Sequence, residues 1–389
     1  MGVIGIIAEF NPLHKGHEYL INEAKKQGTV VCVISGNFVQ RGDTAIAEKR
    51  VRALAALRCG ADLVIELPVI WSMSTAQSFA LGGVSALKAA GCDKIMFGSE
   101  CGNISKLLMA ADILQSSAFS EKLNSELKSG ITFAKARQNA AEALGLKEGV
   151  LSGANNNLAI EYILAARSLG FACEFETVAR RGAGHDTSDI GEFVSASLLR
   201  EKMLAGELEF CRRYMPQASA DLILASPISD IARLDRAILA VLRAKSQKDL
   251  ARLPDISEGV ENKLFSAIRL ATDLEGLYNT VKVKRYTHAR IRRLALSAFL
   301  GFDNSYFMKP VPFLRILGFN SRGELHLKEC LSKSEIPLVL RTADINSLSD
   351  SAKKVFETES RATDLYSLSL PQPLECGLEY TSKIIKLEC

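Results

Sequence analysis

The stretch that decides the fold lies near the start of the chain and reads Val3-Ile4-Gly5-Ile6-Ile7-Ala8-Glu9-Phe10-Asn11-Pro12-Leu13-His14-Lys15-Gly16-His17. Its first part is short, apolar and rich in Val and Ile, which is typical of a buried parallel strand. Pro12 and Gly16 then interrupt the apolar pattern, so a loop is expected there, followed by a helix over residues 17–26. The stretch therefore predicts a strand, a histidine-bearing loop and a helix in succession.

The two histidines of this loop are the strongest chemical signal in the chain. His14 and His17 are three residues apart at a helix start, so their imidazoles point the same way. The free N–H groups and positive end of the helix favour an anion beside them. This arrangement suits the charge that builds up when the α-phosphate of a nucleoside triphosphate is attacked. Two solvent-facing histidines on a turn are the alternative. The chain has only five histidines, however, and two of them flank one glycine here.

Composition describes an ordinary globular protein. The 389 residues can form two or three domains, and 48% are hydrophobic and 24% charged. A net charge of +4 permits contact with nucleic acid without requiring it. The nine cysteines include no C-x-x-C pair and are expected to be buried thiols in a reducing compartment. No basic leader precedes the first strand, and no apolar run reaches about 18 residues. We therefore expect a soluble cytoplasmic protein that does not span a membrane.

The first hundred residues alternate strand and helix patterns. Strands are predicted over residues 3–8, 30–35, 62–67 and 94–98, with helices over 16–27, 47–59 and 75–90. This alternation predicts an α/β fold, with a Rossmann-like parallel sheet that has helices on both faces and binds ligands beyond the carboxyl ends of its strands. Four loops should meet at that edge: Glu9-Phe10-Asn11, Ser35-Gly36-Asn37, Glu66-Leu67-Pro68 and Gly98-Ser99-Glu100.

The remainder of the chain predicts three parts. Residues 1–205 should form the nucleotide-binding domain, with a helical insertion near 104–146, a helix over 157–169 and a further strand over 171–178. Residues 206–302 are helical almost throughout. Residues 303–389 have a mixed pattern, and we expect a small mixed α/β C-terminal region.

A second phosphate-binding motif is predicted at Ser195-Ala196-Ser197-Leu198-Leu199-Arg200. Hydroxyls that cap a helix, with an arginine one turn later, form a cradle for phosphate. A serine cap beside an outward-pointing arginine is common, so the motif alone is weak. Together with the histidine loop it is strong, because nucleotidyl transferases with that loop place such a segment opposite it. Ser197 and Arg200 are then expected to hold the β- and γ-phosphates.

Three further segments carry candidate ligand-binding groups. Arg180 and Arg181 follow a predicted strand, where one of them should reach phosphate or ribose. Asn155-Asn156-Asn157 could cap the helix that follows or read adenine or ribose edges, and the sequence favours neither. The loop Ser35-Gly36-Asn37-Phe38-Val39-Gln40-Arg41-Gly42 could be ordinary surface. Its two glycines allow close approach, Asn37, Gln40 and Arg41 supply donors, and its position beside the first-strand loop favours a role in binding the acyl or nucleotide group.

The densest basic stretch covers residues 282–293, where six of twelve residues are Lys or Arg. Such a run is most often a solvated helix face. No acidic residue offsets these charges, and an aromatic and a histidine are interleaved, which favours contact with nucleic acid. We expect Lys284, Arg285, Arg290 and Arg293 to contact RNA phosphates.

Taken together, these motifs resemble one family. The segments Phe10-Asn11-Pro12-Leu13-His14-Lys15-Gly16-His17, Ser35 to Gly42, Gly98-Ser99-Glu100, Arg181-Gly182-Ala183-Gly184 and Lys284 to Arg293 are similar to those of the bacterial tRNA(Met) cytidine acetate ligases. The resemblance runs from residue 3 to about residue 340. The chain departs from the family's usual Pro-Asn-Asn before the helix, because Ala154 stands in the proline position. The register of the ATP-binding asparagine is therefore left open.

The resemblance implies a two-step reaction. Acetate attacks the α-phosphate of ATP to give acetyl-adenylate. The N4 amine of the wobble cytidine in elongator tRNA(Met) then takes the acetyl group. His14 and His17 are implied as catalytic, and Mg²⁺ is expected on the phosphates without a dedicated carboxylate cage. The implied ATP-binding residues are Ile7, Ala8, Glu9, Phe10, Asn11, Pro12, Leu13, His14, Lys15, Gly16, His17, Glu18, Tyr19, Leu20, Gly102, Asn155 or Asn156, Arg180 or Arg181, Ser197 and Arg200.

Two other functions remain open at this point. One is a nucleotidyl transferase that adenylylates a small phosphate-bearing metabolite, although such enzymes do not need the helical region or its basic stretch. The other is an inert RNA-binding protein that kept the nucleotide-binding fold. The intact histidines, Ser197 and Arg200 argue against inertness.

Overall fold

The central sheet of the computed structural model has eight strands in the order β10-β8-β5-β2-β1-β6-β7, and β9 also pairs with β8. The structure describes residues 2–180, 193–257, 259–283, 286–331 and 333–388. Five neighbouring strands are parallel. They are β5 (Leu63–Leu67), β2 (Gly28–Ser35), β1 (Gly2–Ala8), β6 (Lys94–Ser99) and β7 (Glu174–Ala179). The predicted parallel α/β sheet is confirmed, and its strands begin and end within three residues of the predicted positions.

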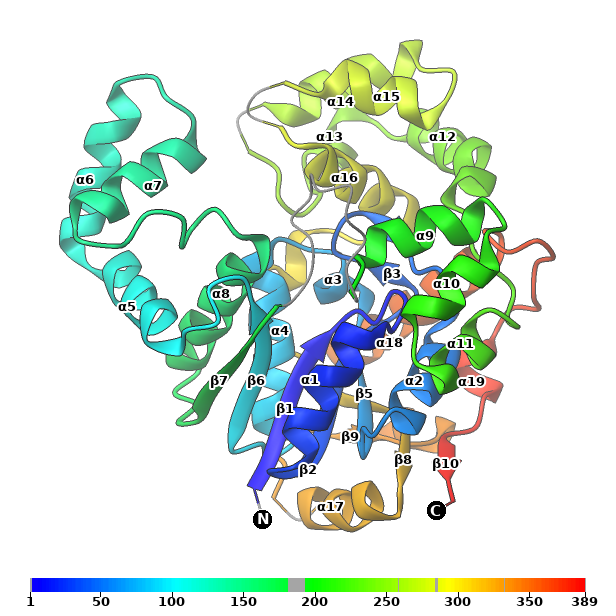
Figure 1. Cartoon of the computed structure of the whole chain (residues 1–389). Helices are drawn as coiled ribbons and strands as arrows, with labels where there is room; N and C mark the ends of the chain where they lie inside the picture. The colour runs from blue at the N-terminus through cyan, green and yellow to red at the C-terminus, as the bar shows by residue number, and fades with distance from the viewer. Residues whose placement is uncertain (1, 181–192, 258, 284–285, 332, 389) are drawn as a thin grey trace.

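Both faces of this parallel sheet are covered at its inner strands β1, β2 and β5, which is why these strands are apolar rather than alternating. The edge strand β7 is less buried and carries two glutamates. On β1, Ile4 and Ile6 pack with α1 (Lys15–Lys25) and α2 (Lys49–Arg58), while Ile7 packs on the other face with α4 (Ala76–Ala89). In Figure 1, α1 lies in front of β1 and α4 lies behind it. The carboxyl ends of these parallel strands therefore share the upper edge of the sheet, away from both chain termini.

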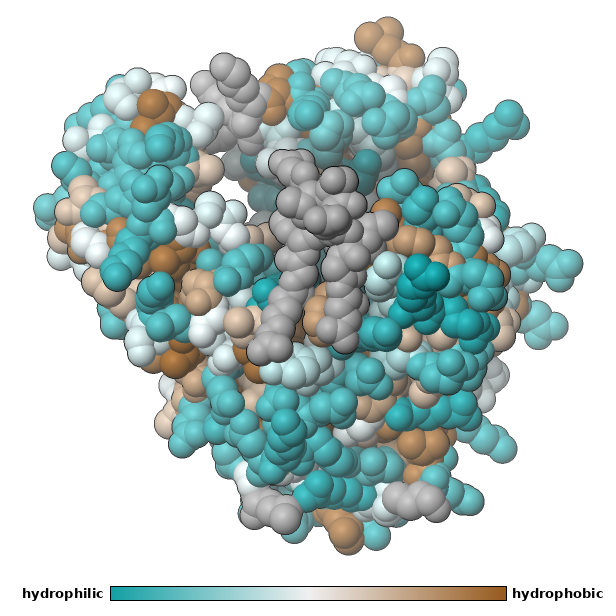
Figure 2. Space-filling model, viewed as in Figure 1, coloured by the Kyte–Doolittle hydropathy of each residue, from teal (hydrophilic) through white to brown (hydrophobic). Residues whose placement is uncertain are grey.

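Two helical parts rise beyond this edge (Figure 1). The first, predicted as an insertion, contains α5 (Ile104–Gln115), α6 (Ser117–Lys128) and α7 (Phe133–Ala143), and it continues into α8 (Ala154–Ser168). The second contains α12 (Asp235–Ala244), α13 (Gln247–Leu250), α14 (Val260–Leu270), α15 (Leu274–Val281) and α16 (His288–Leu300). The space-filling view in Figure 2 shows an opening between the two.

Shorter elements connect these parts. Residues 38–44 form a two-stranded hairpin of β3 (Phe38–Val39) and β4 (Asp43–Thr44). The remaining helices before the C-terminal segment are α3 (Val69–Ser72), α9 (Ala196–Leu204), α10 (Leu208–Tyr214), α11 (Gln217–Ile223), η1 (Ile231–Leu234) and η2 (Asn304–Tyr306).

The C-terminal segment has the expected mixed pattern, but it does not form a sheet of its own. Its β8 (Leu314–Asn320) pairs antiparallel with β5, and its β10 (Ile385–Leu387) and β9 (Leu338–Val339) pair with β8. Its helical elements are α17 (Ser321–Leu331), η3 (Thr342–Ser347), α18 (Asp350–Ser367) and α19 (Leu378–Thr381). These strands thus extend the central sheet, because the edge of β5 is free to accept them. The three-part division of the chain stays a prediction.

A buried ionic cluster joins this segment to the loops at the strand ends. The Lys49 ammonium at the start of α2 lies 3.1 Å from Glu359 of α18 and 2.6 Å from Glu379 of α19. It also pairs with Glu66 at the end of β5, at 2.5 Å. All four side chains are buried. Burial and the neighbouring Glu359 carboxylate raise the pKa of Glu66, which favours its neutral form beside the Lys49 ammonium.

Candidate active site

The first-strand loop places two imidazoles at the start of α1. His14 is the N-cap of this helix, and its Nδ1 accepts the N–H of Gly16 at 3.1 Å. The Nδ1 of His17 accepts the N–H of His14 at 3.4 Å, so the two histidines cap the helix reciprocally. Both rings then carry their hydrogen on Nε2, as assigned from these hydrogen bonds. The rings stack, with centroids 3.8 Å apart and planes inclined by 20°.

This capping corrects one expectation about the helix start. We expected free N–H groups beside the imidazoles. Instead His14 takes the Gly16 N–H through its ring, and its carbonyl accepts the N–H of His17 at 2.8 Å and of Glu18 at 3.1 Å. The reason is that the histidine itself is the N-cap, a position usually taken by Ser, Thr, Asp or Asn. An anion at this point would meet imidazole N–H groups before it meets the helix backbone.

Burial keeps both imidazoles neutral. It lowers the pKa of His14 to about 3, and the positive charge of Arg180 acts in the same direction. Burial, His14 and Arg180 also hold the pKa of His17 well below its ordinary value. At neutral pH the pair therefore offers N–H donors rather than positive charges. Such donors stabilise a phosphate that gains negative charge during a reaction.

The second predicted motif lies directly beside this loop. Ser195 caps α9 by accepting the N–H of Leu198 at 3.2 Å. From the next turn, Arg200 donates to the carbonyl of Asn11 at 2.8 Å and to the hydroxyl of Ser197 at 3.2 Å. The structure thus brings Ser197 and Arg200 together with the histidine loop across nearly two hundred residues of sequence.

Arg41 completes this group; the sequence named it only as one of the donors in the loop from residue 35 to 42. Its guanidinium lies 3.4 Å from the Ser197 hydroxyl, so Arg41 and Arg200 approach that hydroxyl together. Arg41 is exposed at the tip of the hairpin. Two guanidinium groups around one hydroxyl form a site for a phosphate group. The sequence signal was present, because the loop from residue 35 to 42 was predicted as part of the acyl or nucleotide site.

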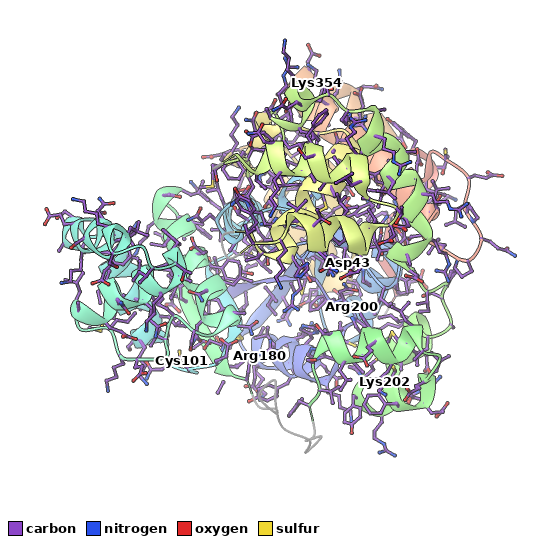
Figure 3. The ribbon with its side chains drawn as sticks, turned by 90° about the horizontal axis from the view of Figure 1, so that it is seen from above. Asp43, Cys101, Arg180, Arg200, Lys202 and Lys354 are labelled. Carbon is purple, nitrogen blue, oxygen red and sulfur yellow. The ribbon has the colours of Figure 1, made fainter. Side chains whose placement is uncertain are left out.

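On the other side of the loop, the structure separates the roles of the asparagines. Asn156 is buried, and its side chain accepts the N–H of Cys101 at 3.1 Å and donates to the carbonyl of Val150 at 3.0 Å. Asn155 instead accepts from Arg180 at 3.3 Å. In Figure 3, Arg180 lies on the side of the insertion helices and Arg200 on the side of α9. The Asn156 side chain is therefore engaged within the protein, whereas Asn155 is the half-buried asparagine that contacts Arg180.

Glu100 fixes this asparagine pair. Its carboxylate accepts the backbone N–H groups of Asn155 at 3.0 Å and Asn156 at 2.7 Å, and the Asn155 amide at 2.6 Å. It thereby caps α8, whose N-cap Gly153 has no side chain. Nearby, Gly102 has a φ of +54°, and a Cβ there would lie 2.6 Å from that of Ala179. Only glycine fits this close approach to β7. The sequence predicted that Glu100 lies at the edge of the sheet, but it did not predict that Glu100 caps α8.

The remaining residues of the first-strand loop divide into core and site. Ile7, Phe10, Leu13 and Leu20 are buried in the hydrophobic core, so they could contact a ligand only through their backbone. Asn11 is also buried, and its Oδ1 accepts the N–H of Ile46 at 2.7 Å. The Nδ2 of Asn11 has no hydrogen-bond partner within the part of the chain that the structure describes. It is therefore a free donor in this loop.

The backbone around Glu9 is held in place by hydrogen bonds from the buried side chain of Arg52. Arg52 is buried and donates to the carbonyls of Glu9 at 2.6 Å and Ala47 at 2.9 Å, and also to that of Gly36. It thus joins the ends of β1 and β2. The Glu9 carboxylate accepts the N–H of Gln40 at 2.9 Å. Sequence reasoning missed Arg52, because nothing local distinguishes it from the other basic residues of α2.

The predicted RNA-binding arginines have protein partners. Arg290 donates to the carbonyl of Asp255 at 2.7 Å, and Arg293 pairs with its carboxylate at 3.0 Å. Arg293 also donates to the carbonyl of Gln40 at 3.3 Å. The geometry gives both arginines a structural role, so their contact with RNA stays a prediction. Lys284, Arg285 and Arg181 lie outside the described residues.

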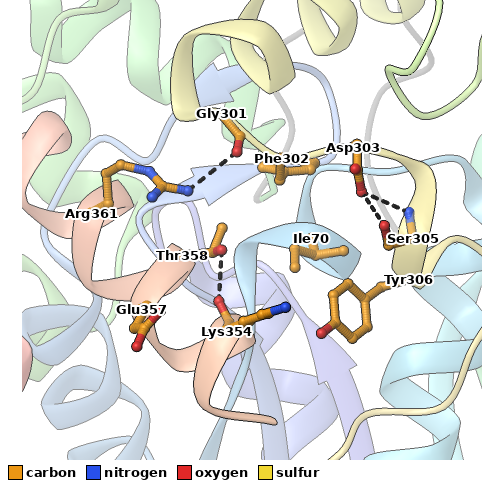
Figure 4. A pocket seen from close by; sticks show the side chains of 10 residues that line it. All are labelled: Ile70, Gly301, Phe302, Asp303, Ser305, Tyr306, Lys354, Glu357, Thr358 and Arg361. Carbon is orange, nitrogen blue, oxygen red and sulfur yellow. Dashed lines mark hydrogen bonds between the residues drawn. The ribbon is translucent and has the colours of Figure 1, made fainter. Parts of the chain in front are cut away.

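A separate pocket of about 390 Å³ lies between α3, η2 and α18. Lys354, Arg361, Asp303 and Tyr306 contribute to its wall (Figure 4). Arg361 is already committed there, since it donates to the carbonyl of Leu300 at 2.7 Å. Figure 3 places Lys354 at the margin of the molecule, away from Arg180 and Arg200. The pocket is therefore distinct from the histidine site.

Other chemistry receives little support from the described part of the chain. Within it, no three His, Cys, Asp or Glu side chains are grouped so that they could hold a metal ion. The seven cysteines whose side chains are described there are free thiols, four of them buried. None of the helices in the described ranges has the length and apolarity needed to span a membrane.

Comparison with known proteins identifies the class that this fold and site define. The family model described as HIGH Nucleotidyl Transferase matches residues 1–378, so the chain is a nucleotidyl transferase of the His-x-Gly-His type. A tRNA(Met) cytidine acetate ligase of Thermoanaerobacter sp. (strain X514) is 36% identical over 407 residues, which cover 100% of both chains. The protein belongs to the family of the tRNA(Met) cytidine acetate ligases.

Solved structures agree with this assignment. The crystal structure of Thermotoga maritima TmcAL bound with alpha-thio ATP is similar with a TM-score of 0.92 at 28% identity, over 100% of both chains. The apo form of the same protein is similar with a TM-score of 0.93 at 30% identity, again over 100% of both chains. The predicted fold and the predicted family are therefore confirmed.

Proposed function

We propose that the protein is an ATP-dependent ligase that activates acetate as acetyl-adenylate and acetylates N4 of the wobble cytidine in elongator tRNA(Met). The observation that carries the proposal is the stacked neutral pair of His14 and His17 beside Ser197 and Arg200, in a chain that matches the cytidine acetate ligases over its full length. A neutral donor pair next to guanidinium groups suits attack at an α-phosphate with pyrophosphate as the leaving group.

The chain's residues divide the work of the first step. The Nε2–H groups of His14 and His17 donate to the α-phosphate oxygens as negative charge develops there. Arg200, Arg41 and Ser197 hold the β- and γ-phosphates and so favour departure of pyrophosphate. We assign Arg180 and Asn155, which contact each other on the other side of the loop, to the nucleoside. Acetate is itself the nucleophile, so the protein needs none.

Mg²⁺ fits this site only as a companion of the triphosphate. In the described residues there is no cage of ligating side chains to hold it, and this ion is commonly bound through substrate phosphates with few protein ligands. When bound, it would offset phosphate charge. The hydrogen-bond donors to the phosphates described above are supplied by the protein and do not depend on the ion.

The test is an exchange assay followed by a transfer assay. Labelled pyrophosphate should enter ATP only when acetate is present. Labelled acetate should then enter a tRNA(Met) transcript, and a transcript with uridine at the wobble position should stay unlabelled. Acetate-independent exchange with AMP transfer to a phosphate ester would instead make the protein a metabolite adenylyltransferase. RNA binding without exchange would make it an inert RNA-binding protein.

A further inference from the structure

The hairpin of β3 and β4 lies where the nucleotide site meets the helical region. At its turn, Gly42 has a φ of +71°, and a Cβ there would lie 2.7 Å from the backbone nitrogen of Arg293 in α16. The hairpin therefore presses directly on the backbone of α16. Arg293 also donates to the carbonyl of Gln40 in the same turn, at 3.3 Å. The residue that follows Gly42 is Asp43, and it is held in place by these contacts.

The carboxylate of Asp43 has one engaged and one open oxygen. Its Oδ1 accepts the N–H of Thr44 at 2.8 Å. No hydrogen bond or ion pair reaches Oδ2 from any residue in the described ranges. The side chain is only half-buried. Figure 3 shows Asp43 next to Arg200 at the opening above the sheet. An acceptor oxygen is thus available at the place where the nucleotide site opens toward the helical region.

Charged groups from four elements face this carboxylate. Arg200 of α9 and Arg292 of α16 favour its ionised form, and Asp230, just before η1, opposes it. Tyr278 of α15 is also within electrostatic range. Burial dominates and raises the pKa of Asp43 above its ordinary value. A carboxylate of this kind is a better proton acceptor than an exposed one.

We propose that Asp43 is the acceptor for the N4 amine of the target cytidine. This inference rests on the proposed function, because it concerns the second step of that reaction. Cytosine presents N4–H as a donor, and aspartate or glutamate is the side chain that accepts it. Asp43 Oδ2 binds one N4 hydrogen, and the other points away as the amine approaches the acetyl-adenylate.

The proton balance of the step follows from this placement. N4 attacks the acetyl carbonyl carbon and forms the C–N bond. The bond between that carbon and the phosphate oxygen breaks, and its electron pair leaves on AMP. The proton that N4 loses passes to the Asp43 carboxylate. No other reactant is needed.

Glu9 is the other carboxylate near the site, and its surroundings suit it less well. One of its oxygens accepts the Gln40 N–H at 2.9 Å, and Arg200, Arg41 and Arg52 all lie within electrostatic range. Burial raises the pKa of Glu9 as it does that of Asp43, so proton affinity does not separate the two carboxylates. What separates them is that Glu9 has three guanidinium groups around it and one oxygen already engaged by the hairpin. Glu9 is therefore better placed to organise the nucleotide side than to receive the amine proton.

Asp43→Asn tests the proposal by separating the two steps. It keeps the shape and the Oδ1 acceptor but cannot take a proton. Transfer of acetyl from preformed acetyl-adenylate to a tRNA(Met) transcript should slow by about 100-fold or more, the usual range for loss of a general base. Acetate-dependent pyrophosphate exchange should stay within about twofold of the wild-type rate, which also shows that the variant is folded. Asp43→Glu should recover part of the transfer rate.

Asp230→Asn is the matched control. It removes a neighbouring carboxylate that raises the pKa of Asp43. Because Asp43 itself is unchanged, both steps of the reaction should persist. The acid limb of the transfer rate should then move to lower pH, whereas Asp43→Asn should lose that limb. The probe for recognition is an anticodon stem-loop RNA. The wild type should bind it more tightly with cytidine than with uridine at the wobble position, and Asp43→Asn should lose this preference.

Two results would overturn the proposal. One is wild-type transfer by Asp43→Asn. The other is equal loss of exchange and transfer, which would place the carboxylate in the adenylation step as a ligand of ATP or its cation. Wild-type protein that shows no acetate-dependent exchange would instead reject the proposed function, and the inference with it.

Discussion

Gly16 and His14 are in contact because residue 16 has no side chain. A Cβ on residue 16 would lie 3.0 Å from Cε1 and 3.1 Å from Nδ1 of the His14 imidazole. The glycine of the His-x-Gly-His motif therefore makes room for the ring that caps the helix and stacks on His17. This explains in steric terms why the motif has a glycine where the backbone conformation alone does not require one.

Gly16→Ala should consequently damage catalysis more than stability. Alanine is favoured over glycine inside a helix, so the melting temperature should not fall. The imidazole must shift by a few tenths of an ångström, and acetate-dependent pyrophosphate exchange should fall about tenfold because catalytic groups tolerate little displacement. Gly2→Ala is the control, since its Cβ would meet Asp93 at an ordinary 3.6 Å. Unchanged exchange in Gly16→Ala would show that the ring position is not critical.

His17→Ala should abolish acetyl-adenylate formation while leaving affinity for tRNA nearly intact. One donor aimed at developing charge contributes about 3–4 kcal/mol to the barrier, so exchange should drop by two to three orders of magnitude. Binding of tRNA should persist because His17 lies in the first turn of α1 and not in the helical region of α12 to α16. Exchange at the wild-type rate in this variant would remove His17 from the mechanism.

The low pKa of His14 predicts a dependence of stability on pH. A folded-state pKa of about 3 lies below the ordinary value of 6.5, so the unfolded chain binds a proton first as the pH falls. The neutral buried ring is fully compatible with folding above pH 6.5, and stability is lost progressively between about pH 6.5 and pH 3. Between pH 7 and pH 5 this one group should remove about 2 kcal/mol from the free energy of unfolding.

His14→Asn is the variant that checks this value, because asparagine is a good N-cap and does not titrate. Denaturant unfolding of the protein without ATP should show a smaller loss of stability between pH 7 and pH 5 than in the wild type. An equal loss in both proteins would show that His14 is not the group responsible.

The sequence predicted those parts of the molecule that depend on local pattern. The parallel strands, the histidine loop and the Ser197–Arg200 segment were all found because apolar spacing, glycine, proline and helix-capping residues act over a few positions. The pairing of β8 with β5 was not, since it joins residues some 250 positions apart and leaves no local mark. The same holds for Arg52, because two of its carbonyl partners, those of Glu9 and Gly36, are brought next to it only by the fold.

Arg290 shows what a local pattern leaves out, although its contact with RNA stays a prediction. A dense basic run favours contact with nucleic acid, but the pattern cannot show that Asp255 lies against it. Part of the positive charge of this basic stretch is therefore neutralised by Asp255, which precedes the stretch in the sequence. Conversely, Asn155 and Asn156 are indistinguishable by type, and only the fold shows that the side chain of Asn156 is engaged by buried partners.

Arg41→Ala should weaken the phosphate site without affecting the fold. Arg41 is exposed, and its only hydrogen bond within the described residues is to Ser197. Loss of one charge-assisted hydrogen bond to pyrophosphate should lower kcat/KM for ATP about tenfold or more in the exchange assay. Arg212→Ala, which removes an exposed ion pair with Asp221 in α11, should leave exchange unchanged. Equal kinetics for both variants would exclude Arg41 from the site.

The last prediction divides the basic stretch into two pairs. Arg290 and Arg293 share Asp255, so the double variant Arg290→Ala/Arg293→Ala should destabilise the helical region and lower the melting temperature. Its cost should be about 1–3 kcal/mol, because a partly buried carboxylate loses its hydrogen bonds. Lys284→Ala/Arg285→Ala should instead weaken tRNA binding, and each lost phosphate contact should reduce the log–log salt slope by somewhat under one unit. Pyrophosphate exchange without tRNA should survive in the second pair. The opposite result would reverse the two assignments: a salt slope that is unchanged in Lys284→Ala/Arg285→Ala and reduced in the folded Arg290→Ala/Arg293→Ala protein. Arg290 and Arg293 would then have to release Asp255 and bind RNA phosphates instead.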